Sequence, residues 1–260
     1  MRLAVLSRRL GTRQFEWNYR VILLIVSTPK AESDRTPIDR AFLTDDLART
    51  EIVLVRHGQQ NFPGPDAPIV AWRDPPLTDL GHSQALAAGR ALAAEDFSAV
   101  YSSQLQRAHD TGLAVAQFHS LEVTVLESLE EIHMFGDLEP TQHPSDVIDE
   151  IEMEGARRRF SRELRWDTYP YTESGFELRR RVSNTIEGLI SKHPGERIVV
   201  ACHGGVINAY IAEFLGINMD MFFRPAHASI HRVLARNDRR VVSTLNELHH
   251  LMTPEDILSY

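Results

Sequence analysis

The sequence predicts an α/β protein, a three-layer α/β/α sandwich built around a mostly parallel central sheet. Short apolar runs rich in β-branched residues, typical of buried strands, lie at 52–55, 99–101, 123–125 and 197–202. Segments with helical spacing of apolar residues separate these runs, most clearly at 77–94. Strands that alternate with helices form parallel sheets with both faces covered, and this predicts the fold class.

The remaining elements follow in order along the chain. An acidic block at 146–154 precedes a basic block at 157–165, and together they predict a helix that lies on the surface. Thr172 or Ser174 is placed to cap a long helix that ends before Pro194. We further expect helices at about 103–118 and at 206–215, and strands at 229–235 and 241–245.

The first fifty residues differ from the rest of the chain. Residues 1–50 contain scattered basic residues and one short apolar run at 21–26, and they show no sustained periodicity. That run reaches about a third of the ~18 residues that span a bilayer, and no cleavage site typical of a signal peptide follows it. We therefore expect a flexible N-terminal extension at 1–50 and one catalytic domain at 51–260.

Composition and charge exclude several classes of function. The chain of 260 residues carries a net charge of −8, so we expect neither nucleic acid nor membrane as a partner. Its one cysteine, Cys202, rules out an internal disulfide and agrees with a cytoplasmic location. An acidic protein that handles anions has to concentrate positive charge in one place, and this makes clusters of Arg and His informative.

Two of the expected strands end in the same way, with a histidine followed by glycine. Arg56-His57-Gly58 follows the strand at 52–55, and His203-Gly204-Gly205 follows the strand at 197–202. Ligands of open α/β sheets bind beyond the carboxyl ends of the strands, and the N-terminus of a following helix favours an anion. With Arg107 at the same edge, these residues predict a positive pocket of phosphate size.

Four ordered segments carry a family resemblance. They are LVRHG at 54–58, DPPLTDLG at 74–81, YSSQLQRA at 101–108 with Thr111, and VVACHGG at 199–205. In this order and spacing they resemble the signature of the histidine phosphatase superfamily, in its phosphoglycerate mutase-like branch. The likeness covers about residues 51–247.

The resemblance implies a set of roles. His57 would attack phosphorus and become phosphorylated. Arg56, Arg107 and His203 would hold the phosphoryl oxygens, with Gly204 at the substrate as well. The resemblance also implies catalysis by positioning and electrostatics, with neither a metal nor a cofactor.

The general acid and one turn depart from the family pattern. The resemblance places the acid at Glu131, with Glu130 as the alternative, because the segment after it is one residue longer than expected. The sequence does not decide whether the His133 side chain faces the pocket or the surface. In the turn after His57, the usual hydroxyl and amide positions hold Gln60 and Pro63, so Asn61 is the candidate that remains for binding substrate.

The reaction expected is hydrolysis of a small-molecule phosphate monoester through a phosphohistidine. Phosphoryl transfer of the phosphoglycerate mutase type is the first alternative, although the segment 132–172 is short for the lid that a mutase needs. A protein that binds phospho-ligands without catalysis is a second alternative. A metal pair of His227 and His231 lacks a third ligand, and a homodimer is left open.

Overall fold

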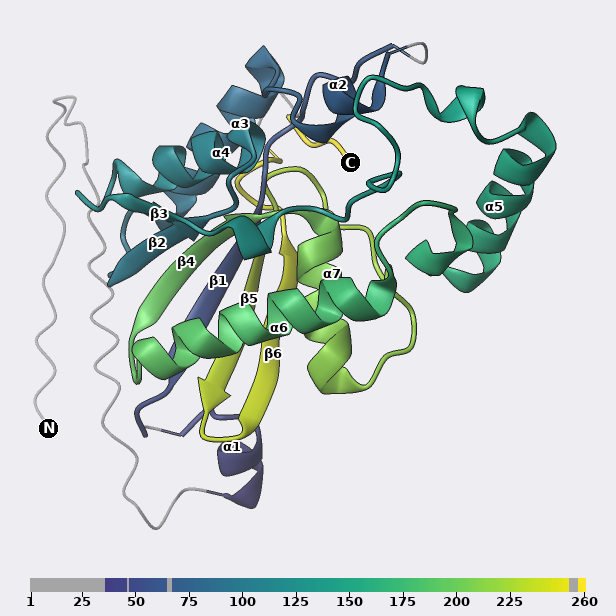
Figure 1. The fold of residues 1–260 in the computed structure, drawn as a ribbon. Coiled ribbons are helices and arrows are strands. Elements are labelled where there is room, and N and C mark those ends of the chain that lie inside the picture. Colours follow the sequence, from purple (N-terminus) through teal and green to yellow (C-terminus); the bar gives the residue numbers. More distant parts are fainter. Residues whose placement is uncertain (1–35, 46, 65–66, 253–256) are drawn as a thin grey trace, which may run out of the picture. The chain divides into compact units, whose positions relative to one another are not determined.

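The centre of the fold is a sheet that runs in the order β3-β2-β4-β1-β5-β6 (Figure 1). The structure is a computed structural model, and it describes residues 36–45, 47–64, 67–252 and 257–260. The strands are β1 (Thr50–Arg56), β2 (Ala99–Ser102), β3 (Val123–Val125), β4 (Arg197–Cys202), β5 (Ile230–Arg236) and β6 (Arg239–Glu247). The helices are α1 (Pro37–Ala41), α2 (Ile69–Arg73), α3 (Asp79–Leu92), α4 (Gln106–Ala116), α5 (Glu150–Glu163), α6 (Gly175–Lys192) and α7 (Gly204–Leu215), with short 3₁₀ turns η2 (Glu127–Leu129), η3 (Pro144–Asp146) and η4 (Trp166–Thr168).

The sheet is mostly parallel, which confirms the predicted fold class. β1, β4, β2 and β3 are parallel neighbours, whereas β5 runs antiparallel to β1 and to β6. Because β5 and β6 follow one another through a short turn, they form a hairpin at one edge of the sheet.

Both faces of the sheet are covered by helices, and the alternation along β1 shows how. Ile52 and Leu54 belong to a core cluster with α6 and α7, while Val53 and Val55 belong to a second cluster with α3 and α4. All four side chains are fully buried. A central strand buried on both faces needs the continuous apolar run that the sequence has at this point.

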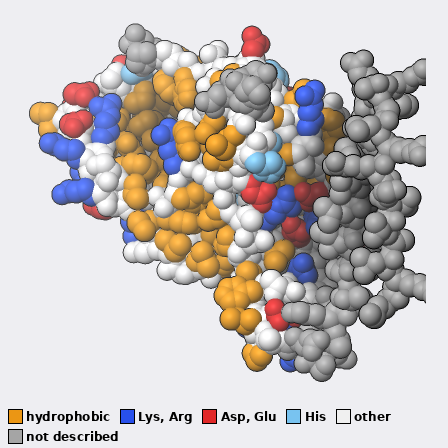
Figure 2. All heavy atoms as spheres, turned by 180° about the vertical axis from the view of Figure 1, so that it is seen from behind, with side chains coloured by type: hydrophobic (Ala, Val, Ile, Leu, Met, Phe, Trp, Pro, Cys, Tyr) orange, Lys and Arg blue, Asp and Glu red, His pale blue; other side chains and the backbone are white. Residues whose placement is uncertain are grey.

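The starts of two helices are fixed by capping residues, and for α6 the cap is Ser174, one of the two candidates from the sequence. Thr78 accepts a hydrogen bond from Gly81 N at the start of α3, and Ser174 forms a capping box with Glu177 at the start of α6. The helix expected in the acidic and basic blocks is α5, where Ala156 is the buried residue. Charged side chains crowd the left edge of Figure 2, where α5 lies. None of the helices in the described ranges has both the length and the apolar character of a membrane span.

The folded unit begins before residue 51. It extends from Thr36 to Tyr260, and Leu43 is 1% exposed within it. The carboxylate of Asp45 accepts two hydrogen bonds from Arg236 on β5, at 2.5 and 2.9 Å. The predicted division at residue 50 therefore lies inside this unit. Isolated contacts of this kind leave no periodic pattern, so the sequence gives no sign of them. The rest of the predicted extension, residues 1–35, lies outside the described residues.

Candidate active site

The predicted site residues gather at the carboxyl edge of the four parallel strands. His57 follows β1, Arg107 is the second residue of α4 after β2, Glu131 follows β3 and η2, and His203 links β4 to α7. α3, which comes after β1 and the short α2, covers one face of the sheet, and α7, which follows β4, covers the other. The chain therefore leaves β1 and β4 in opposite directions, and a ligand crevice forms where such neighbours diverge.

His57 is oriented by its own turn. Its Nδ1 lies 2.7 Å from the carbonyl oxygen of Gly58, so Nδ1 carries the proton and Nε2 presents its lone pair. Burial lowers the pKa of His57 well below its ordinary value, and the positive charges of Arg107 and Arg56 add to the effect. A side chain at position 58 would place its Cβ 2.2 Å from Gly81 O, so this turn requires glycine.

Arg56 is held by residues that precede β5, the neighbour of β1 on the other side from β4. Its Nη1 donates to Pro225 O at 2.5 Å, and its Nη2 donates to Nε2 of His227 at 3.1 Å. Burial lowers the pKa of Arg56 to about 10, which leaves the guanidinium charged at neutral pH. The ideal Cβ of Gly204 would lie 3.7 Å from its Nε, so Arg56 reaches the N-terminus of α7.

Arg107 is buried on the other side of the crevice, with 4% of its surface exposed. Its Nη1 donates to the backbone carbonyl of Arg73 at 3.1 Å and lies 3.7 Å from the Asp74 carboxylate. Asp74 also accepts from the first amide of α4. Thr111, one turn further along α4, accepts from Gly58 N at 3.2 Å and thereby ties this helix to the turn that carries His57.

His203 completes the group of buried side chains. It is fully buried at the N-cap of α7, and its ring centroid lies 5.1 Å from that of His57. Burial lowers its pKa well below the ordinary value, and Arg107 and Arg56 act in the same direction. His203 is therefore neutral at physiological pH, with one ring nitrogen as a donor.

Four buried nitrogen atoms of these side chains have no hydrogen-bond partner among the described residues: Nε of Arg56, Nε of Arg107, and both ring nitrogens of His203. Buried polar atoms are almost always paired, so unpaired donors that converge on one place call for a polar ligand. Three bulky donors around the free Nε2 of His57 suit a tetrahedral anion.

Glu131 lies on the α7 side of this group. Its Oε2 accepts from Gly205 N at 3.1 Å, and its charge acts on both Arg56 and Arg107. Glu130 instead binds Arg73 and Gln104, at 2.9 and 2.8 Å, and lies 3.3 Å from Nε2 of His133. The structure therefore places Glu131 among the predicted site residues. The carboxylate of Glu130 is instead bound to Arg73 and Gln104, at the mouth of the crevice.

Asn61 is less closely associated with the site. It is exposed, and its backbone N–H donates to Pro76 O at 2.8 Å. Among the described residues, no hydrogen bond links its side chain to the other predicted site residues.

His227 contacts the predicted site residue Arg56, and the sequence did not reveal this contact. Because Arg56 can only donate, Nε2 of His227 accepts, and its Nδ1 donates to Ser259 Oγ at 2.9 Å. Gln84 of α3 donates to the same oxygen at 2.9 Å. Only the spacing of two histidines drew attention to this position, and the described residues contain no group of three His, Cys, Asp or Glu that could hold a metal ion.

Comparisons with known proteins point to one family. The chain is 32% identical over 205 residues to the metal-independent phosphoserine phosphatase of Arabidopsis thaliana, a match that covers 78% of this chain and 83% of that protein. It is 34% identical over 170 residues to phosphoglycerate mutase-like protein 4 of the same plant, covering 65% and 72%. The solved structure of a mycobacterial glucosyl-3-phosphoglycerate phosphatase with VO3 is 26% identical, with a TM-score of 0.62 over 76% of this chain and 99% of that one.

The predicted family and enzyme class are thereby confirmed. The family model for branch 1 matches residues 52–248, which covers the sheet from Ile52 in β1 to the end of β6. With its α/β fold and with phosphatases of this type among its relatives, the chain belongs to the histidine phosphatase superfamily.

Proposed function

We propose that this protein hydrolyses small-molecule phosphate monoesters through a phosphorylated His57. The observation that carries the proposal is the convergence of unpaired buried nitrogens from Arg56, Arg107 and His203 beside the free Nε2 of His57. A phosphoryl group supplies the acceptor oxygens that these donors lack, and its charge offsets the buried guanidinium groups.

The reaction has two steps. In the first, Nε2 of His57 attacks phosphorus, the bond from phosphorus to the ester oxygen breaks, and the alcohol leaves with a proton. In the second, water attacks phosphorus, the bond to nitrogen breaks, and inorganic phosphate is released. The arginines and His203 hold the three equatorial oxygens in both steps, which is how phosphoryl transfer is mainly accelerated.

Glu131 is the group that we assign to the proton. It would protonate the leaving oxygen in the first step and take a proton from water in the second. Its carboxylate lies at Gly205, next to the phosphoryl-binding side chains, whereas Glu130 is bound to Arg73 and Gln104. The donor set consists of arginine and histidine side chains, so we propose that the reaction uses no metal and no cofactor.

The leaving group would lie at the mouth of the crevice, where the Arg73 side chain is 59% exposed and Glu130 and His133 are close. We propose that the leaving group is a small polar alcohol. We also propose that the protein is cytoplasmic, because its single cysteine is free and buried. Phosphoserine and phosphoglycerates are the first compounds to try, because relatives carry such names. Release of inorganic phosphate, rather than a transferred phosphoryl group, separates a phosphatase from a mutase.

The decisive experiment compares wild-type protein with His57→Ala on a panel of phosphate monoesters. We expect wild type to form an acid-labile phosphoenzyme in rapid quench and His57→Ala to form none and to lose turnover. His250→Gln is the matched control, because the ring of His250, like that of His57, is bound to a backbone carbonyl, here that of Ala228 at 2.9 Å. Substantial hydrolysis by His57→Ala would remove the nucleophile from the proposal.

A further inference from the structure

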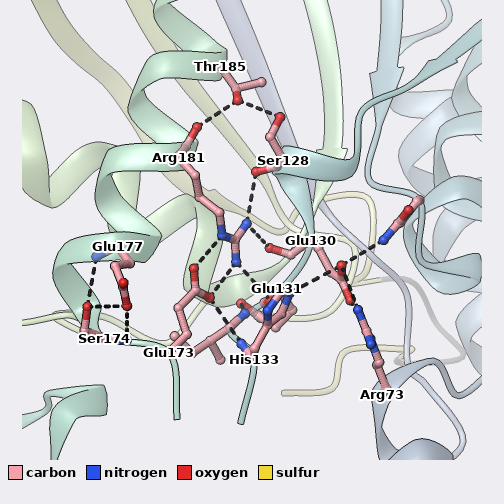
Figure 3. Close-up of polar contacts among 12 residues, drawn as sticks. Arg73, Ser128, Glu130, Glu131, His133, Glu173, Ser174, Glu177, Arg181 and Thr185 are labelled. Carbon is pink, nitrogen blue, oxygen red and sulfur yellow. Dashed lines mark hydrogen bonds and ion pairs between the residues drawn. The ribbon is translucent and has the colours of Figure 1, made fainter. Parts of the chain in front are cut away.

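Arg181 on α6 has every donor of its guanidinium occupied, and most of the contacts are with one segment (Figure 3). Its Nη1 donates to the carbonyl oxygens of Ser128 and Glu130 at 3.0 and 2.6 Å, and its Nη2 donates to that of Glu131 at 3.1 Å. One side chain thus holds three backbone carbonyls within four residues. The five donors of a guanidinium lie in a fixed plane, so this arrangement fixes the path of the backbone as well as its distance from α6.

Glu173, two residues before the start of α6, fixes Arg181 in turn. Its carboxylate accepts from Nε and Nη2 of Arg181 at 2.7 and 2.9 Å, with side chains that are 11% and 21% exposed. Glu173 also accepts from His133 N at 3.3 Å, and its own N–H donates to His133 O at 3.0 Å. The segment 128–133 is therefore held at both ends, on either side of Glu131.

Glu131 has little room to move at its other end. Its Oε2 accepts from Gly205 N, and a Cβ at position 205 would lie 2.2 Å from its Oε1. The carboxylate fits against the first turn of α7 because glycine stands there. Oε1 of Glu131 also accepts from Ile132 N at 3.0 Å, so the position of the carboxylate depends on the path of the backbone at 131 and 132.

We propose that Arg181, fixed by Glu173, is a positioning residue that sets the carboxylate of Glu131 for proton transfer. The inference rests on the function proposed above for Glu131. Arg181 hydrogen-bonds to the backbone of 128–131 and to Glu173, and its charge acts on His203 without a hydrogen bond to it among the described residues. Its loss therefore affects the step in which the leaving oxygen needs a proton, and leaves the attack by His57 on an activated ester largely intact.

Arg179 offers a matched control on the same helix. It donates to the carboxylate of Asp220 and to the backbone carbonyls of Ile217 and Met219, at 2.6 to 3.2 Å. Both arginines thus join one carboxylate to several carbonyls from α6, but Arg179 holds the segment after α7 instead of the segment with Glu131. The structural cost of Arg179→Met is therefore similar to that of Arg181→Met.

The experiment measures kcat on an alkyl phosphate and the rate of His57 phosphorylation by an activated aryl phosphate. Misplacing a reacting group by about 1 Å costs about 10²-fold, so we expect Arg181→Met to lower the alkyl rate by about 10- to 100-fold. The aryl rate should change by less than about 3-fold, because a good leaving group needs no proton. Arg181→Lys, which keeps the charge and loses the planar fork, should fall between. A general loss of folding would lower both rates equally, so their ratio reports position.

Two further measurements separate this inference from the proposed function. In the Glu131→Gln background, Arg181→Met should cause no additional loss on the alkyl ester, because the acid that it positions is gone. The amide signal of Gly205 in NMR, and its protection from hydrogen exchange, should change in Arg181→Met and in Glu131→Gln and should stay unchanged in Arg179→Met. This readout needs no turnover, so it tests the positioning of Glu131 even if wild type hydrolyses no monoester.

The inference is overturned by either of two results. One is an equal fall of the alkyl and aryl rates in Arg181→Met. The other is a Gly205 amide that responds to Arg179→Met as much as to Arg181→Met. A wild-type protein without phosphatase activity whose Gly205 amide still follows Arg181 would instead overturn the proposed function and support the positioning of Glu131.

Discussion

Two buried histidines make the stability of this protein sensitive to mild acid. His227 and His231 are 1% and 0% exposed, and burial lowers the pKa of each to about 3. In the unfolded chain a histidine titrates near 6.5, so below that pH the unfolded state binds a proton that the folded state does not. The unfolding free energy is therefore fully present above about pH 6.5 and falls as pH falls towards 3.

The size of the effect follows from linkage. Between pH 7 and pH 5, a histidine with these two pKa values loses about 2 kcal/mol, so the pair loses about 4 kcal/mol. Domains are stable by about 5–15 kcal/mol, and the loss is a large part of that. Carboxylates titrate lower: the hydrogen bonds from Arg232 lower the pKa of Glu95 from its ordinary 4.5, which keeps that group out of this window.

The assay is urea unfolding at intervals of half a pH unit from 7 to 5, on wild type, His231→Gln and His227→Gln. Each substitution will lower stability at pH 7, but the slope against pH is what decides. Below pH 6.5, we expect the unfolding free energy of each variant to change with pH less steeply than that of wild type, by about 1.4 kcal/mol per pH unit. Slopes identical to that of wild type would show that these histidines are protonated in the folded protein and refute the reasoning.

Three further predictions concern the site and the folded unit. Exhaustive chelation with EDTA should leave phosphatase activity unchanged, and recovery of lost activity on adding a divalent ion would contradict a reaction supported by arginine and histidine alone. Deletion through residue 48 should lower the unfolding free energy in urea by about 2 kcal/mol or more relative to deletion through residue 35, because it removes the buried side chain of Leu43. His227→Leu should lower kcat/KM by about 10-fold, because it removes one hydrogen bond to the charged Arg56. The loss should be the same for aryl and alkyl phosphates, because Arg56 holds phosphoryl oxygens in both reactions. A loss confined to one type of ester would argue against that role of His227.

The parts of the fold that the sequence predicts are those encoded locally. A continuous β-branched run specifies a strand buried on both faces, and a histidine directly after it has to lie at the carboxyl edge. That logic located His57 and His203 without any structure. The direction of β5 was beyond it, because an apolar strand that follows a loop can join the sheet edge either way.

The contacts missed by the sequence join residues far apart in the chain. His227 contacts Arg56 across 171 positions, and nothing near either residue indicates the pair. Arg181 stands in a helix whose pattern is fully explained by its amphipathic packing, so its contacts with the carbonyls of 128–131 leave no trace in the periodicity. The assignment between Glu130 and Glu131 had the same limit, since neighbouring carboxylates differ only in which tertiary partners they meet.

The two arginines of α6 also bear on attempts to change what the enzyme accepts. Because Arg179 and Arg181 fasten two different loops to one rigid helix, this helix is a shared support for the segment that carries Glu131 and for the segment after α7. Directed evolution towards new alcohols should therefore randomise the exposed positions at the mouth, such as Trp72 and Arg73, and leave α6 untouched. Libraries that include the two α6 positions will be dominated by clones that misplace a loop, whichever substrate is used for selection.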